Sequence, residues 1–492
     1  MGSEGKLGRI IIPLALSQFI CSFAGSSLNV AITDISKSLG TDITGVQTAI
    51  TFFTLTMAAL MIPASKLTDI SGRKKIYIIG LCVYAIGALI AALAPLLGFL
   101  YFGYSILQGL GTAFLIPPVY ILVTVLYSGV TRAKGFGLVS AGGGIGSATG
   151  PLIGGALTTA FTWRANFILQ VLIVIVIIIL GLRLVKEPPK EGPKHHFDFG
   201  SAVLSAVGLV LIVVGLQTTS TYGWLTASQD FVIGNTVLIP EGSISPFLVF
   251  AIAGLIFNVA FYYSLKHREH IGKEPLIQTR LLHNRTSNLG LVTQNVQWLI
   301  LQGVFFCGSV FFQEIRGLNA IETGLVLTSA TIGVLLTSAF AERLAKLRSQ
   351  RLNIRSGFVL VIIGIVLILA LGSVHNPNSY FLPGFFVIGA GFGIMLTSSV
   401  TVVQSEFPDK DQGEISGLSR SISNLGSSFG VSIIGSILVL ELATAAEPFI
   451  LSFTVMLGFA VVGMIASILI PKPSSQKKVI AESNAQIKKN DR

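Results

Sequence analysis

Long apolar runs separated by short polar segments make up most of this chain. A membrane-spanning helix needs about 20 consecutive apolar residues, and in hydrocarbon only a helix satisfies its own backbone hydrogen bonds. Reading the runs between charged or Pro/Gly-rich breaks predicts fourteen transmembrane helices. They lie near residues 9–33, 46–68, 76–94, 99–127, 133–160, 164–185, 197–219, 245–265, 287–312, 321–343, 354–373, 380–404, 414–440 and 447–471.

The spacing of these runs also predicts how the chain is divided. Residues 1–186 are expected to form an N-terminal six-helix bundle, residues 187–280 two additional central helices with flanking loops, and residues 281–471 a C-terminal six-helix bundle. The polar, Lys-rich residues 472–492 are expected to be a cytoplasmic tail. Between the two central helices, residues 220–244 carry Asp230 and Glu241 but no Lys or Arg, which predicts a short exposed hairpin or loop.

Composition and charge agree with a membrane protein. Hydrophobic residues make up 52% of the 492 residues and charged residues 11%, and the mean hydropathy is +0.79, which indicates an all-α polytopic membrane protein. The net charge of +11 could indicate nucleic-acid binding. However, the predicted outer loops hold only Lys37, Arg164 and Arg316 of the 33 Lys and Arg residues, so the positive-inside bias explains the charge. We therefore expect a multi-pass plasma-membrane protein with both termini cytoplasmic and no nucleic-acid partner.

Two motifs are built from residues that suit helix ends and close helix contacts. In the loop Ser65 to Lys75, Asp69 closes a helix, Gly72 permits a tight turn and Arg73 holds the loop in the cytoplasm. In the fifth predicted span, residues 146–155 read G-S-A-T-G-P-L-I-G-G. Small residues four apart let helices approach closely, and the proline bends the helix.

Together these motifs resemble those of the major facilitator superfamily. The loop is similar to its G-x-L-x-D-x-x-G-R-K motif, with Ser65 in place of the first Gly, and residues 146–155 are similar to the G-x-x-x-G-P-x-x-G-G motif of its antiporters. Residues 163–167 (W-R-A-N-F) and 107–111 (L-Q-G-L-G) resemble the fourteen-span drug:proton antiporter branch. The resemblance covers almost the whole chain. It implies the major facilitator fold with fourteen helices arranged 6 + 2 + 6, and secondary active export by alternating access around a midplane site.

The resemblance assigns conformational roles to residues of both motifs. In the family the aspartate pairs across the domain interface and stabilises the outward-facing state, so Asp69 is the expected counterpart. The full set is Asp69, Gly72, Arg73, Gly146, Gly150, Pro151, Gly154 and Gly155.

The sequence departs from this branch at two charged positions. Ala24 occupies the position of an expected aspartate in span one, and Ser105 that of an expected arginine in span four. The predicted spans carry no Asp or Glu near their middle, and the six His residues fall in loops, so proton coupling is doubtful. Asp34 and Glu314, at the outer ends of spans one and nine, are the nearest coupling candidates; alternatively, both are solvated residues at helix ends.

Substrate contacts are expected from spans one, four, nine and thirteen. Gln294 and Gln297 lie at i and i+3 on one helix face, but they could instead hydrogen-bond between helices. Arg420, the deepest charge, could bind an anionic or zwitterionic group or could snorkel to the cytoplasm. The candidate substrate-binding residues are Asn29, Tyr104, Gln108, Gln294, Gln297, Trp298, Arg420 and Asn424.

Rival functions remain open at this point. The chain could be an exporter of amphipathic small molecules, a lipid or metabolite transporter or uniporter, or a non-transporting membrane sensor. We expect no enzyme, because the spans hold no set of catalytic residues. We also expect no cofactor and no metal site, because Cys21, Cys82 and Cys307 lack ligand spacing. The expected partners are the lipid bilayer and a small-molecule substrate, with the protein a monomer.

Orientation can be tested by labelling single cysteines from outside the cell. A cysteine placed at Asp230 should react with a membrane-impermeant maleimide, and one placed at Lys190 or Lys346 should react only after permeabilisation. The reverse pattern would contradict the predicted orientation.

Overall fold

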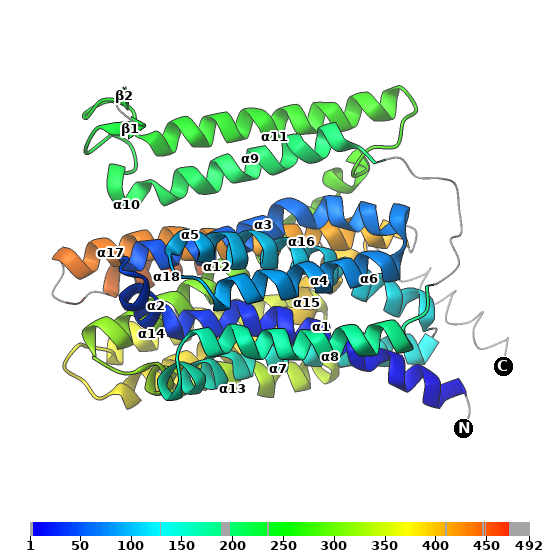
Figure 1. Ribbon diagram of the computed structural model, residues 1–492, viewed down its shortest axis with the longest axis horizontal. Helices are drawn as coiled ribbons and strands as arrows, with labels where there is room; N and C mark the ends of the chain where they lie inside the picture. Colours follow the sequence, from blue (N-terminus) through cyan, green and yellow to red (C-terminus); the bar gives the residue numbers. More distant parts are fainter. Residues whose placement is uncertain are drawn as a thin grey trace.

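The computed structural model describes residues 3–127, 129–187, 197–233, 236–408, 411–444, 447 and 449–471, and these form an almost entirely helical protein (Figure 1). The predicted tail, residues 472–492, lies outside the described residues. Within the described residues, thirteen helices are long and apolar enough to cross a membrane, and each coincides with a predicted span. The remaining predicted span, the fifth (133–160), falls on a helix rich in glycine that is not among the thirteen.

The N-terminal half comprises residues up to Leu184. Its helices are α1 (Ser3–Ser27), η1 (Leu28–Ala31), α2 (Ile32–Leu39), α3 (Ile43–Ser71), α4 (Arg73–Ala92), α5 (Leu97–Leu100), η2 (Tyr101–Gln108), α6 (Gly109–Leu126), α7 (Gly129–Ala160) and α8 (Arg164–Leu184). The first span continues through η1 and α2 to Leu39, beyond the predicted end near residue 33. The prediction stopped at the first polar residues, although Thr33 and Ser36 are buried in the structure.

Two central helices, α9 (Phe199–Gln217) and α11 (Pro246–His270), pack against each other beside the rest of the protein (Figure 1). We call them the helix pair. Between them lie α10 (Thr219–Tyr222) and an antiparallel hairpin of β1 (Phe231–Ile233) and β2 (Thr236–Ile239), which confirms the predicted hairpin. We call this end of the molecule the hairpin end.

Residues 271–284 join the helix pair to the C-terminal half at the opposite end, and they include η3 (Thr279–His283). We call this segment the connector and this end the connector end. The C-terminal half contains α12 (Arg285–Val310), η4 (Phe311–Ile315), α13 (Ala320–Leu347), α14 (Gln350–Leu371), η5 (Asn378–Phe381), α15 (Leu382–Gln404), α16 (Gln412–Phe429), η7 (Gly430–Ile434), α17 (Gly435–Thr444) and α18 (Ile450–Leu469).

Glycines allow α7 to approach α1 closely. A Cβ at Gly142 would overlap the Ala15 carbonyl oxygen, and one at Gly146 would overlap that of Phe19. Backbone contact of this kind gives dispersion attraction where lipid offers no hydrophobic driving force. The many glycines of α7, which lower its hydropathy, therefore serve helix packing.

This contact predicts a difference between two glycines of α7. Gly146→Ala should destabilise the protein by about 1–3 kcal/mol, because a backbone atom must move to admit the methyl group. Gly137→Ala should have little effect, because nothing lies within 4 Å of the added Cβ. Thermal unfolding of the purified variants in detergent measures both. Equal unfolding temperatures would contradict the α1–α7 contact.

Candidate functional site

The two halves meet along two helix pairings, α3 with α16 and α7 with α13. Each pairing joins a helix of one half to a helix of the other. Residues that bridge the halves are therefore the candidates for controlling movement between them.

Polar contacts bridge the halves at the hairpin end. The Thr33 hydroxyl donates to Glu314 Oε1 at 2.8 Å, and Gln313 Nε2 donates to the Val30 carbonyl oxygen at 2.9 Å. Gln47 Nε2 of α3 donates to the Val431 carbonyl oxygen at 3.2 Å and also reaches Gln217 Oε1 of the helix pair at 3.4 Å. Of the two coupling candidates, Glu314 takes part in these contacts. The side chains of both candidates, Asp34 and Glu314, are exposed.

A line of hydroxyl groups follows the contact between α3 and α16, which we call the hydroxyl seam. The hydroxyls of Thr54 and Ser428 lie 2.7 Å apart, and Ser421 Oγ donates to the Ala58 carbonyl oxygen at 2.5 Å. Ser432 Oγ lies 3.5 Å from Thr51 Oγ1. Two hydroxyl groups of α16, those of Ser421 and Ser428, thus find partners on α3 of the other half.

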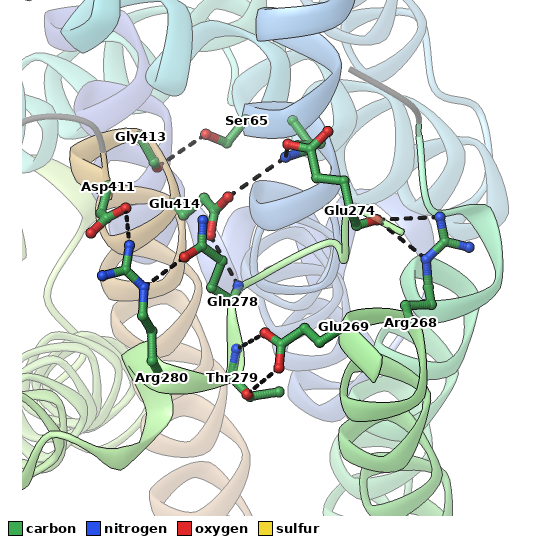
Figure 2. A network of polar contacts seen from close by, with 11 residues as sticks. Ser65, Arg268, Glu269, Glu274, Gln278, Thr279, Arg280, Asp411, Gly413 and Glu414 are labelled. Atoms are coloured by element: carbon green, nitrogen blue, oxygen red, sulfur yellow. Dashed lines mark hydrogen bonds and ion pairs between the residues drawn. The ribbon is translucent and has the colours of Figure 1, made fainter. Parts of the chain in front are cut away.

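A charged network closes the connector end (Figure 2). Ser65 Oγ donates to the Gly413 carbonyl oxygen at 3.1 Å, joining α3 to α16. Lys66, only 5% exposed, lies 2.5 Å from Glu274 of the connector and 3.6 Å from Glu414 of α16. Asp69 lines a small cavity together with Lys66 and Glu414. The predicted conformational aspartate therefore lies next to the interface. Lys66, Glu274 and Glu414 were not predicted, because no motif or spacing in the sequence links them.

Gly72 and Arg73 form a turn that holds a carboxylate. Gly72 has φ +107°, a conformation that favours glycine, and it ends α3. The backbone N–H groups of Arg73 and Lys74 donate to the Glu187 carboxylate at 2.8 and 2.9 Å. A negative charge at the N-terminus of α4 interacts favourably with the helix dipole and so stabilises the helix. Glu187, which follows α8, was missed because nothing in the sequence links it to this loop.

The glycine-proline motif divides its contacts between two partners. Added Cβ atoms at Gly146, Gly150 and Gly154 would meet α1 within the same half. Gly155 instead approaches the Ala320 carbonyl oxygen of α13, to which an added Cβ would be 2.5 Å distant. A Cβ at Gly324 of α13 would in turn overlap the Pro151 carbonyl oxygen. The end of the motif therefore contacts the other half.

Tyr104 and Gln108 are packed inside the N-terminal half. Tyr104 stacks on Phe53 with ring centroids 4.5 Å apart, and its hydroxyl is buried without a partner among the described residues. Gln108 Nε2 donates to Gln170 Oε1 at 2.7 Å, and Tyr84 donates to the same oxygen at 2.8 Å. Gln170 was not predicted, although it is a polar residue in an otherwise apolar span.

Gln294 and Gln297 have similar surroundings in the C-terminal half. Gln294 Oε1 accepts from the Ser419 hydroxyl at 2.7 Å, and Gln297 Oε1 accepts from the Ser399 hydroxyl at 3.1 Å. Both side chains are 1% exposed, and their amino groups are buried without a partner among the described residues. Helix-to-helix bonds, the alternative considered from the sequence, thus use the oxygens and leave the amino groups available.

The remaining substrate candidates differ in burial. Asn29 is 1% exposed, and its side-chain amide donates to the Gly25 carbonyl oxygen of the same span at 3.2 Å. Trp298 and Asn424 are half-buried. The structure leaves the substrate role of all three as a prediction.

Arg420 contacts the opposite half. Its guanidinium group donates to the Tyr120 hydroxyl at 2.5 Å and lies 5.0 Å from the centre of that ring. Tyr120 in turn stacks on Phe136 of α7 at 6.0 Å. Arg420 is therefore paired with an aromatic residue across the interface, and its role in substrate binding stays a prediction.

These features define a polytopic helical membrane protein with two helical halves joined by polar bridges. The sequence profile of the Major Facilitator Superfamily matches residues 14–308, 231–431 and 304–489. The chain therefore belongs to the major facilitator superfamily of membrane transporters.

Known proteins are similar to this chain in sequence and in fold. The chain is 25% identical over 439 residues to the multidrug resistance protein Stp of Mycobacterium tuberculosis (strain ATCC 25618 / H37Rv), covering 89% of this chain and 77% of that protein. It is 24% identical over 442 residues to the multidrug transporter protein MdtP of Bacillus subtilis (strain 168), with coverage of 89% and 77%. The crystal structure of an auto-inhibited POT family peptide transporter has a TM-score of 0.64 at 14% identity, covering 94% of this chain and 96% of that chain, which shows the same fold.

The contact between Arg420 and Tyr120 predicts graded effects of substitution. Arg420→Met should lower stability by about 0.5–2 kcal/mol, the range of a cation–π contact. Tyr120→Phe keeps the ring and should cost less than Tyr120→Leu, which removes it. Thermal unfolding in detergent ranks the three variants. A Tyr120→Phe variant as unstable as Tyr120→Leu would assign the stabilisation to the hydroxyl group instead.

Proposed function

We propose that this protein is a secondary active transporter that exports amphipathic small molecules by alternating access. The observation that carries the proposal is the bridging of two helical halves at both ends of their interface, by Gln47, Gln313 and Thr33 at one end and by Ser65 and Lys66 at the other. Breaking either set of bridges would expose a site between the halves to one side of the membrane.

The proposed domain division follows the predicted one. Residues 1–186 and 281–471 are two six-helix bundles that rock against each other, and residues 187–280 supply the helix pair with its flanking loops. We place the connector end and both chain termini in the cytoplasm of a plasma-membrane protein, in line with the positive-inside bias. We propose that it works as a monomer without a nucleic-acid partner.

The proposed substrates are drug-like amphipathic molecules, in keeping with relatives named as multidrug resistance and multidrug transporter proteins. The substrate candidates supply aromatic rings and carboxamides and include one cation, Arg420. Such a set suits neutral or anionic amphiphiles better than cations, because a buried cation requires a nearby carboxylate.

Purified protein in liposomes tests the function. A panel of neutral, anionic and cationic amphipathic dyes should show flux above that of protein-free liposomes, with neutral and anionic members favoured. Asp69→Asn should slow this flux while leaving expression nearly normal, because a single acid at a helix end adds little to folding. A protein that folds but moves no member of the panel would favour a sensor role, and one that moves only phospholipids or polar metabolites would favour the alternative substrates.

The same assay measures coupling. We expect the flux to respond weakly to an imposed pH gradient, because Ala24 and Ser105 replace the charged residues expected in the N-terminal half. If the response is strong, Glu314→Gln or Asp34→Asn should abolish it. Strong coupling that survives both substitutions would contradict the proposed absence of a proton carrier in the spans.

A further inference from the structure

The connector, residues 271–284, crosses the interface between the halves at the connector end. It follows α11 of the helix pair and leads directly into α12 of the C-terminal half. Figure 2 shows Arg280 and Gln278 of the connector beside Asp411 and Glu414, and Glu274 beside Arg268. It makes charged and apolar contacts with both halves.

The connector is fixed to the C-terminal half by several contacts. The backbone N–H of Gln278 donates to Glu414 Oε2 at 3.0 Å, and Arg280 pairs with Asp411 at 2.6 Å. Leu276 and Leu281 are buried in a cluster that includes Ile415 of α16 and also Ile62 of α3. Since the connector is also covalently continuous with α12, we expect it to move with this half.

The connector is equally fixed to the helix pair. The Glu269 carboxylate at the end of α11 accepts from the backbone N–H of Thr279 at 2.6 Å. Arg268 pairs with Asp198 at 3.1 Å, joining α11 to the residue that caps α9, and it also donates to the Glu274 carbonyl oxygen at 3.2 Å. The helix pair and the connector therefore form one structure at this end.

A charged contact with the N-terminal half is made by Lys66. Lys66 of α3 is 5% exposed and lies between the carboxylates of Glu274, which is 33% exposed, and Glu414, which is 17% exposed. Its ammonium group neutralises two carboxylates that belong to the connector and to α16. Separation of the halves at this end must remove Lys66 from both.

We propose that the connector is a strap that holds the connector end closed, and that Lys66 is the point at which the strap releases. The inference rests on the proposed alternating-access function. It assigns control of opening at the connector end to the helix pair, which acts through the connector. Lys66 occupies a position that the G-x-L-x-D motif leaves variable, so its contact with the strap is additional to any contact of Asp69. Removing the Lys66 charge both deletes the attraction and leaves Glu274 and Glu414 as neighbouring carboxylates without their shared cation.

The test measures the distance between the halves in the absence of substrate. Of the native cysteines, Cys82 is exposed, whereas Cys21 and Cys307 are buried. All variants are therefore made in a Cys82→Ser background. Spin labels are attached to cysteines introduced at Lys75 and Ser349, which are exposed positions at the connector end, one in each half. Double electron–electron resonance spectroscopy in nanodiscs then gives the distribution of distances between the two labels. Lys66→Gln should increase the ratio of open to closed populations by about tenfold, the effect of losing a strong charged contact.

Three further variants define the mechanism. Lys66→Arg keeps the charge and should retain the wild-type distribution. Lys273→Gln removes a charge from an exposed connector residue next to Glu274 and should also leave it unchanged. Glu274→Gln leaves Lys66 paired with Glu414, so it should give an intermediate shift. Monodisperse elution of each variant confirms folding before the measurement.

The outcomes separate the strap from the function. A Lys66→Gln distribution equal to that of the wild type, or a Lys273→Gln shift as large as that of Lys66→Gln, would overturn the strap while transport in liposomes still supported the proposed function. Absence of both transport and any separation of the halves would instead contradict the proposed function.

Discussion

Hydrocarbon offers no hydrogen-bond partner, and this constraint determines where the polar side chains of the spans lie. Each must find a partner inside the protein or leave a polar atom unsatisfied at a cost of about 1–3 kcal/mol. Gln108 therefore pairs with Gln170 and Gln294 with Ser419, while Thr54 meets Ser428 from the opposite half. The polar groups of the spans consequently mark the surfaces along which helices meet.

The same constraint made the spans predictable from the sequence. A run of about 20 apolar residues has few alternatives to a spanning helix, so the predicted positions match the thirteen apolar helices, the helix pair and the hairpin. Errors arose where polar residues are buried at a helix end, as at Thr33 and Ser36. The turn at Gly72 was also predicted, since this glycine ends α3 with a positive φ.

The partners of the site could not be predicted, because they are distant in sequence. Lys66 lies 208 residues from Glu274, and a loop glutamate gives no sign of which lysine it will meet. Tyr104 and Gln108 were predicted to contact substrate because they lie in the fourth span. In the structure they lie in η2, a π-helical segment, and Gln108 is hydrogen-bonded to Gln170, a partner 62 residues away in sequence. The sequence indicated which residue types belong to the site but not which of them meet.

The hydroxyl seam has a consequence for the energetics of movement. When α3 and α16 separate, each hydroxyl and carbonyl that loses its partner can accept or donate a bond to an incoming water molecule. Opening then replaces nearly every lost hydrogen bond between the helices with a hydrogen bond to water, so the enthalpy of the seam changes little. A seam of interlocked leucines would instead expose apolar area at roughly 25 cal/mol per Å². The seam thus provides a joint that can be hydrated and dried repeatedly with only a small difference in free energy between its two states.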